Sequence, residues 1–471
     1  MPKEFAFSPF EKELRELQPE DLVSLKQVSE GWYIEYKREE PKAPAIAKSL
    51  SAFANTYGGW LFIGIVEESK ENPVAGDFLG IAKQNVDATL QRMRKAVADL
   101  INPSLYFESK VLWGPVSNLG LLEDRAIICV WVPRSYTAPH VHKKGVIYRR
   151  VSDASEPKPE NDRFVLDQLW RRGDDIRRKY KEWYDRDPEF SKGEESVPYV
   201  RLMIVADKWS ERNVWIDADE NKIHTLFNKN DNDAVEIPFE TIHRSAEGFT
   251  CRQLSNNDPH NLTLTWRLQN NLVSDVIIPL PLYQPSSLEV LRLEMLGYSN
   301  TDQFISVLTQ YKIKTIRVVD LNFLFRILMG VAAIQRRLCA FCSWSEPYHI
   351  KMKALNVWRT MPFVDISKVL DRFEEFGPPM CLDSVVSSLR GTGPESFLEI
   401  PEFTESENES SNILNQAIMM FSLIANTFGI PAFMPHIDKS TETPYHVELQ
   451  EICHRALNVQ SNRNKRSSRE V

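Results

Sequence analysis

Cysteine is scarce in this chain, and what there is cannot form a disulfide framework. The 471 residues include six cysteines, far fewer than a small secreted scaffold held by disulfides would contain. Cys339 and Cys342 form a single C-x-x-C pair, and the second pair that a four-ligand zinc site needs is missing. We interpret the two residues as packed thiols, with zinc binding or redox use as the alternative.

Long apolar runs are missing as well. The strongest run, from Leu321 to Ile334, contains Asn322 and Arg326 and is too short to cross a bilayer, so it predicts a buried helix. The first ten residues lack the apolar segment of a signal peptide. We therefore expect a cytoplasmic protein with no membrane partner.

An excess of basic residues is also absent. The net charge is −8, which argues against indiscriminate binding to polyanions. Residues 1–192 contain as many basic as acidic residues, so the remainder of the chain carries the whole excess of acid. If one part binds nucleic acid, the N-terminal part is favoured, because phosphate contacts need local positive charge.

The length predicts two or three domains. We expect an α/β (α+β) N-terminal domain and a mixed C-terminal region, in which a β-rich part precedes a mainly helical part. In chain order, the expected segments are an N-terminal arm (1–29), the α/β domain with a closing basic helix (30–184), a polar linker (185–198), a β-rich unit (199–285), a mainly helical unit (286–455) and a disordered basic tail (456–471). Helices are expected at 43–54, 86–100 and 164–184, and a β-rich run at 222–227.

The most informative stretch is residues 52–65, where an apolar helix tail enters a small-residue turn and then a buried strand. Within the turn, Gly58 and Gly59 permit a positive φ angle and close approach of the backbone to a partner. Together with Asn55, they predict a corner whose amides contact a phosphate. The alternative is a tight turn that simply needs glycine. No Gly-Lys-Ser/Thr follows, so this is not a P-loop and we do not expect ATP.

A second pattern places carboxylates and a lysine near this corner. Side chains alternate along a strand, so Glu35 and Lys37 point to the same side, and Glu30 reaches the same cleft if the chain bends at Gly31. Glu67, after the next strand, completes the group. Carboxylates can hold a divalent cation, and a lysine can stabilise charge on a phosphate. An edge-strand charge pair facing solvent is the alternative.

This pattern predicts Glu30, Glu35, Lys37 and Glu67 as catalytic residues. Glu30, Glu35 and Glu67 would be the ligands of Mg²⁺ or Mn²⁺ if the protein is a nuclease. Otherwise we expect no cofactor.

A basic loop and strand occupy residues 134–150, with two tyrosines among the charges. Such a combination suits contacts to phosphates and stacking on bases, although a solvated loop is the alternative. The predicted nucleic-acid-binding residues are Asn55, Gly58, Gly59, His140, His142, Lys143, Lys144, Arg149 and Arg150. The helix 164–184 also carries basic residues, but Asp174 and Asp175 interrupt them, which favours a salt-bridged surface helix.

The order of these elements resembles the Schlafen AlbA_2 domain family. The resemblance covers roughly residues 30–155 and implies an α/β fold used for nucleic-acid binding. It rests on E-x4-E-x-K (Glu30, Glu35, Lys37), the Asn-Thr-x-Gly-Gly corner, Ile101-Asn102-Pro103, Ala138-Pro139-His140 and Gly145-x-x-Tyr148-x-Arg150.

In the Schlafen ribonucleases that share this domain, three acidic residues support metal-dependent cleavage of structured RNA such as transfer RNA. Two of these acids map onto Glu30 and Glu35. The third position falls at Val66, with Glu67 next to it, and this departure puts cleavage in doubt while leaving binding intact.

We therefore predict a protein that binds DNA or RNA through the N-terminal domain, with a C-terminal region that senses or recruits an unknown partner. A metal-dependent endoribonuclease is the first alternative, so enzymatic activity stays open. A nucleotide-binding signalling protein is the second alternative. Domains of this kind can pair to form a longer groove, which makes a homodimer a further expectation.

Overall fold

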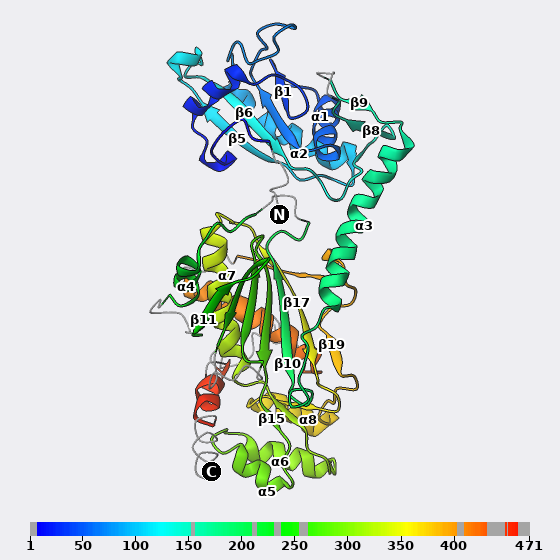
Figure 1. The fold of residues 1–471 in the computed structure, drawn as a ribbon, viewed down its shortest axis with the longest axis vertical. Coiled ribbons are helices and arrows are strands. Elements are labelled where there is room, and N and C mark those ends of the chain that lie inside the picture. Colours follow the sequence, from blue (N-terminus) through cyan, green and yellow to red (C-terminus); the bar gives the residue numbers. More distant parts are fainter. Residues whose placement is uncertain are drawn as a thin grey trace. The chain divides into compact units, whose positions relative to one another are not determined.

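The computed structural model describes residues 7–151, 156–209, 214–229, 237–253, 262–402, 409–430, 448–449 and 451–459. The chain separates into two compact units (Figure 1). The N-terminal unit comprises Met1–Asp185 with Trp209–Asn213, and the C-terminal unit comprises Arg186–Lys208 with Val214–Val471. Each unit has hydrophobic clusters of its own.

A five-stranded sheet forms the centre of the N-terminal unit. Its strands run in the order β1-β2-β6-β3, and β5 also pairs with β6; β1 and β2 are parallel, and the other pairs are antiparallel. The elements are β1 (Ile34–Lys37), α1 (Ala43–Asn55), β2 (Gly59–Ile63), β3 (Ile81–Ala82), η3 (Lys83–Asn85), α2 (Val86–Leu100), β5 (Glu108–Trp113), η4 (Ser117–Leu119) and β6 (Arg125–Val132). The predicted α/β class is confirmed.

Alternation along the strands gives this sheet two apolar faces. Leu61 and Ile63 of β2 pack with the apolar positions of α1 and α2. Trp60 and Phe62 point to the other face, which the 3₁₀ helices η1 (Leu14–Glu16) and η2 (Pro19–Gln27) cover with their leucines. The segment predicted as an N-terminal arm therefore contributes to the core of the domain.

A small four-stranded sheet packs against α1. Its order is β4-β7-β8-β9, and α1 contacts both β7 and β8. The elements are β4 (Ile101–Asn102), β7 (Val141–His142), β8 (Val146–Arg149) and β9 (Lys158–Pro159), followed by the long helix α3 (Arg163–Asp185). Arg172 of α3 donates hydrogen bonds to the carbonyls of Ala54 (3.3 Å) and Asn55 (3.2 Å), where the negative end of the α1 dipole lies.

An eight-stranded sheet dominates the C-terminal unit. Its order is β11-β12-β13-β14-β10-β17-β19, and β20 also pairs with β17. A smaller sheet has the order β15-β16-β18. The strands are β10 (Tyr199–Val205), β11 (Thr241–Arg244), β12 (Gly248–Arg252), β13 (Thr265–Gln269), β14 (Val273–Pro279), β15 (Leu282–Tyr283), β16 (Val318–Asp320), β17 (Tyr348–Leu355), β18 (Met361–Phe363), β19 (Val385–Ser387) and β20 (Leu398–Ile400). The helices are α4 (Glu220–Phe227), α5 (Leu288–Glu294), α6 (Thr301–Gln310), α7 (Leu324–Phe341), α8 (Ser367–Phe376), η5 (Pro394–Ser396) and α9 (Glu409–Thr427).

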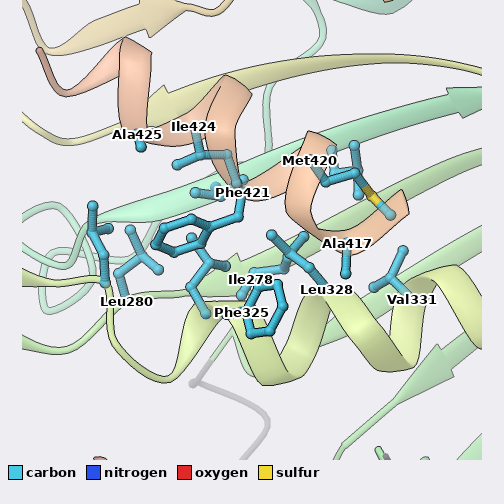
Figure 2. Packing of buried hydrophobic residues seen from close by; sticks show 14 of the residues in the cluster. Ile278, Leu280, Phe325, Leu328, Val331, Ala417, Met420, Phe421, Ile424 and Ala425 are labelled. Atoms are coloured by element: carbon cyan, nitrogen blue, oxygen red, sulfur yellow. The ribbon is translucent and has the colours of Figure 1, made fainter. Parts of the chain in front are cut away.

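One hydrophobic core joins the strands and helices of this unit. Helices α7 and α9 pack on each other, with the rings of Phe325 and Phe421 edge to face at 5.9 Å (Figure 2). Leu202 and Ile350, from the adjacent strands β10 and β17, belong to the same cluster. The structure thus does not separate 199–285 from 286–455 as the sequence suggested, because β17 completes a sheet that begins at β10.

Helix α7 contains most of the strongest apolar run of the sequence, Leu321 to Ile334, which was predicted to be a buried helix. Leu324, Leu328 and Val331 are buried in it. In the part of the chain that the structure describes, no helix combines the length and apolar character that a membrane span requires.

The C-x-x-C pair lies at the end of α7. Gln335 donates a hydrogen bond to Cys339 Sγ at 3.4 Å, and burial raises the pKa of the Cys339 thiol to about 12. A thiol with so high a pKa stays protonated at neutral pH, so it behaves as a packed side chain.

Residues 222–227 form helix α4 instead of the expected β-rich run. The Asp219 side chain caps the helix by accepting a hydrogen bond from the Lys222 amide at 2.8 Å. Ile223 and Phe227 stand one turn apart and are both buried. A helical period over so few residues is easily mistaken for alternation.

Apart from Asp185, which ends α3, the predicted linker 185–198 belongs to the C-terminal unit. Asp187 forms ion pairs with Arg201 (3.0 Å) and Lys353 (2.7 Å), two buried residues on neighbouring strands. Phe190 stacks on Tyr199 with ring centroids 5.0 Å apart. The polar composition of this segment thus reflects a charged sheet face rather than a free connection.

The predicted tail begins inside a helix. Residues 451–459 are helical, and Ala456 and Val459 are buried in the large core. Residues 460–471 lie outside the described residues.

Candidate nucleic-acid interface

The turn between α1 and β2 is a corner that only glycine fits. Gly58 has a φ angle of 78°, and a Cβ atom there would lie 2.7 Å from the Val132 carbonyl oxygen. A Cβ atom on Gly59 would lie 2.4 Å from the Phe53 ring. The Gly58 amide donates to the Phe53 carbonyl at 2.9 Å. The glycines therefore serve close packing, and the Gly58 amide is already used within the chain.

Asn55 faces the interior instead of a ligand. Its side-chain amide donates to the carbonyls of His140 (2.9 Å) and Tyr148 (3.0 Å), and its carbonyl oxygen accepts from the His140 amide (2.7 Å). Three bonds from one buried side chain thus fasten the β7–β8 hairpin to the end of α1, which lies beside β8 in Figure 1.

Glu35 lies on the face of β1 that looks toward α1. Its Oε1 accepts a hydrogen bond from Ser49 Oγ and contacts Lys37 Nζ, both at 2.8 Å. Its Oε2 pairs with Arg150 Nη1 at 2.9 Å. Both carboxylate oxygens are therefore engaged within the domain, and Glu35 and Lys37 form the expected neighbouring pair.

Arg150 is buried completely, although it was predicted to bind nucleic acid from the surface. Besides pairing with Glu35, its guanidinium donates to the carbonyls of Ile34 (3.1 Å) and Gly31 (2.9 Å from Nε). Burial lowers its pKa, and the charge of Glu35 opposes that shift. Arg150 therefore acts as an interior counter-ion that joins β8 to β1, and no phosphate can reach it in this conformation.

Lys37 completes this charge cluster. Burial lowers its pKa, but the neighbouring carboxylates of Glu35 and Glu30 outweigh burial, and the pKa lies above the ordinary value. Lys37 is therefore cationic at neutral pH and pairs with Glu35.

Glu30 and Glu67 stand next to each other beside this cluster. Glu30 accepts a hydrogen bond from the Tyr36 amide, and Glu67 forms a single β-bridge with Ala75 after β2. Burial raises the pKa of Glu30 to about 8; the Tyr36 amide and Lys37 oppose the rise, and the charge of Glu67 adds to it. Glu30 is therefore largely protonated at neutral pH.

The expected metal ion would need three carboxylate ligands. A site of three carboxylates would need Glu30, Glu35 and Glu67, but both oxygens of Glu35 already bind Ser49, Lys37 and Arg150. Within the described residues, no group of three or more His, Cys, Asp or Glu side chains is arranged to hold a metal ion. The observed arrangement thus supplies two adjacent carboxylates and does not fit a three-carboxylate site.

The two predicted histidines also face inward. His140 is fully buried and its Nδ1 lies 2.7 Å from the Pro103 carbonyl; burial lowers its pKa to about 4, so the ring is neutral. His142 Nδ1 accepts from the Lys144 amide at 3.2 Å, and its ring packs edge-on against Tyr148. Both rings support the hairpin from within.

The surface of the hairpin carries the remaining predicted cations. Lys143 and Lys144 are exposed at the turn between β7 and β8, and Lys158 of β9 is exposed opposite Arg149. Arg149 pairs with Glu160 at 2.7 Å. Of the predicted basic residues, the two turn lysines are therefore the ones placed to meet a ligand.

Helix α3 carries ion pairs along its exposed side. Arg178 pairs with Asp175 at 2.9 Å, and Lys181 pairs with Asp185 at 2.5 Å. These are the short-range pairs expected of a salt-bridged surface helix.

Residues 30–159 match the family model described as Schlafen, AlbA_2. The N-terminal unit contains a Schlafen AlbA_2 domain. The resemblance inferred from the sequence is confirmed over these residues, and the AlbA_2 family is associated with nucleic-acid binding.

One similar solved structure is the crystal structure of the DIP2311 protein from Corynebacterium diphtheriae. It is 21% identical in sequence, with a TM-score of 0.20. The match covers 30% of this chain and 27% of that chain. A likeness at this level has no bearing on function.

Three residues that hold the elements of the AlbA_2 domain together were not identified from the sequence. Ser49 binds Glu35, Thr56 Oγ1 accepts from the Arg150 amide at 2.9 Å, and Arg172 binds the end of α1. For the buried position of Arg150, alternation along β8 offered a signal, because it places Arg150 on the same side as Tyr148, toward α1. No pattern in the sequence identified Glu35 as the partner of Arg150.

Replacement of Arg150 tests the buried ion pair. We expect Arg150→Ala to lower the free energy of unfolding of the N-terminal unit by about 3–5 kcal/mol, because Glu35 is left buried without its counter-ion. The free energy of unfolding of Arg150→Lys should lie between those of the wild type and Arg150→Ala, since lysine keeps the charge but lacks the planar guanidinium group. Urea unfolding of the full chain measures both.

Arg149→Ala is the matched control, because the Arg149–Glu160 pair is only partly buried. This substitution should lower the free energy of unfolding by about 1 kcal/mol or less. Equal losses for the two alanine variants would contradict the role assigned to Arg150.

The pKa of Glu30 predicts a pH dependence of stability. A carboxyl group whose pKa rises from 4.5 to about 8 on folding stabilises the fold below pH 4.5, and this contribution is lost as pH rises through about 8. The melting temperature of Glu30→Gln should therefore lie close to that of the wild type at pH 5 and above it at pH 8–9. Each kcal/mol of difference in the free energy of unfolding shifts the melting temperature by roughly 2–4 °C.

Thermal melts across this pH range measure the difference. The exposed Glu68→Gln variant is the control and should follow the wild type throughout. A gap between Glu30→Gln and wild type that does not change with pH would refute the assignment.

Proposed function

We propose that this protein binds nucleic acid, DNA or RNA, through the β7–β8 turn of its AlbA_2 domain. The observation that carries the proposal is the exposure of Lys143 and Lys144 side by side at this turn. Among the described residues, neither forms an ion pair. Two exposed cations side by side, without an acidic partner, are a favourable contact for a phosphate backbone.

The framework beneath the turn supports the same proposal. Asn55 holds both strands of the hairpin, Thr56 holds the end of β8, and Arg150 ties that end to β1. A basic turn on so constrained a base loses little freedom on binding, which favours affinity. In this proposal Asn55, Thr56 and Arg150 hold the hairpin in place, and the two lysines contact the ligand.

Neutralising the two lysines tests the interface. Lys143→Ala/Lys144→Ala should weaken binding to all sequences alike, because phosphate contacts carry no base information. The slope of log K against log salt should become shallower by about 1.4 for a single strand or about 1.8 for a duplex, if both lysines contact phosphates. Fluorescence anisotropy with labelled oligonucleotides over a salt series measures this slope.

Lys26→Ala/Lys70→Ala is the matched control, since both residues are exposed and lie outside the small sheet. It removes the same charge and should keep the wild-type slope. An unchanged slope in the Lys143/Lys144 variant would exclude the turn as the interface.

The C-terminal unit is proposed to recruit or sense a partner. It exposes large apolar side chains, among them Phe376 (67% exposed) and Leu382 (77% exposed), and exposed apolar groups of this size favour protein contacts. A homodimer is one form that such a contact could take. A cytoplasmic location is proposed as well, in keeping with the six cysteines, which are all free thiols.

Metal-dependent cleavage of structured RNA such as transfer RNA is the second candidate. The adjacency of Glu30 and Glu67 favours it, because a divalent cation bound to both side chains would take the place of the proton that Glu30 keeps at neutral pH. Against it, the third carboxylate is already bound within the domain. We therefore assign no step of a reaction to this group.

Incubation of the full chain with transfer RNA decides this candidate. If it is correct, fragments appear with Mn²⁺ or Mg²⁺ and not with a chelator, and Glu30→Gln/Glu67→Gln abolishes them. The exposed Glu68→Gln should cleave like the wild type. Intact transfer RNA after prolonged incubation with either metal would eliminate the candidate.

A further inference from the structure

A cluster of aromatic side chains lies at the same corner and is not explained by the lysine turn. The ring of Tyr57 lies 5.4 Å from that of Trp32 and 6.2 Å from that of Tyr33, between centroids. Tyr33 in turn stacks on Phe7 at 5.0 Å. We call Trp32, Tyr33 and Tyr57 the aromatic cluster.

The aromatic cluster differs from the core beside it. Tyr57 is 45% exposed, and Trp32 and Tyr33 are partly exposed, whereas Trp60 is buried. The turn requires glycine at positions 58 and 59, but its backbone makes no comparable demand for a large side chain at 57. Three aromatic rings grouped at the surface leave flat apolar area in contact with water, which favours a planar ligand.

The position of the cluster links it to the proposed interface. Thr56, next to Tyr57, holds the Arg150 amide at one end of β8, and Lys144 precedes the other end. At about 3.3 Å per residue, the backbone from Lys144 to Arg150 spans roughly 20 Å. A strand of a few nucleotides can therefore reach from the turn lysines to the aromatic rings.

We propose that the aromatic cluster stacks on unpaired bases, so that the preferred ligand is a single-stranded nucleic acid or a single-stranded segment. This inference rests on the proposed nucleic-acid binding and adds the class of ligand. Bases in a duplex are stacked on one another and cannot reach the rings, whereas unpaired bases can. Stacking tolerates any base, so the preference concerns strandedness and not sequence.

The test compares one labelled strand of about 12 nucleotides, free and annealed to its complement, by anisotropy with the full chain. We expect tighter binding to the free strand. Tyr57→Ala should weaken binding to the free strand roughly 5- to 100-fold, as loss of one stacking contact implies, and leave duplex binding unchanged. Tyr57→Trp should restore single-strand binding, because the stacking surface returns.

Leu122→Ala is the control, since Leu122 is an apolar side chain of the same unit that is 63% exposed. It should bind both probes like the wild type. Thermal melts confirm that the variants are folded, and quenching of Trp32 fluorescence, taken as the difference from Trp32→Phe, reports directly on stacking.

The outcomes separate the two levels of inference. A wild-type chain that binds neither probe would overturn the proposed function together with this inference. Equal affinity for both probes, with no effect of Tyr57→Ala on the free strand, would overturn the aromatic cluster as a stacking site while nucleic-acid binding stands.

Discussion

The pairing of Glu35 with Arg150 is the interaction on which the AlbA_2 domain depends. It joins β1 to the end of β8, two segments far apart in the sequence, and does so out of contact with water. Two charges removed from water are tolerated only when each is satisfied by good geometry. Here Ser49 and Lys37 bind the other carboxylate oxygen, and backbone carbonyls bind the rest of the guanidinium. The pair therefore holds the end of β8 against β1.

This constraint separates the polar residues of the region into buried ones, which stabilise the fold, and exposed ones, which can contact a ligand. Polar side chains beneath the hairpin, such as Asn55 of α1 and His140, are buried and form hydrogen bonds within the chain. Those at its turn stay in solvent, where Lys143 and Lys144 can meet a ligand. A basic loop in the sequence thus contains two populations with opposite roles, and burial decides which role each residue takes.

Local regularities made much of this fold predictable from the sequence. The helical spacing of Ile46, Leu50 and Phe53 was sufficient for α1, and two adjacent glycines before an apolar run were sufficient for the corner. Alternation also placed Glu35 and Lys37 on one side of β1. Each of these inferences needed only neighbours within a few residues, where the backbone geometry is regular.

The parts that escaped prediction depend on contacts between distant segments. The sequence did not indicate that Arg150 would turn inward to Glu35, because Arg149, the residue before it, is also an arginine. In the structure, Arg149 lies nearer the surface and Arg150 is buried. Asp187 likewise appeared to belong to a linker, since its partners Arg201 and Lys353 come later in the chain. Strand β17 was missed within a region dominated by helical patterns, although its pairing with β10 completes the sheet.

The pairing of β10 with β17 also sets the order in which the chain can fold as it is made. Tyr199 pairs with Leu355, so one edge of β10, the first strand of the C-terminal sheet, stays unpaired until β17 has left the ribosome, although its other edge can pair earlier with β14. Contacts so distant in sequence form slowly and leave apolar strand faces uncovered in the meantime. The N-terminal unit needs almost nothing beyond Asp185, and it can be complete while its neighbour is still being synthesised. Chaperone demand during synthesis should therefore fall mainly on the second half of the molecule.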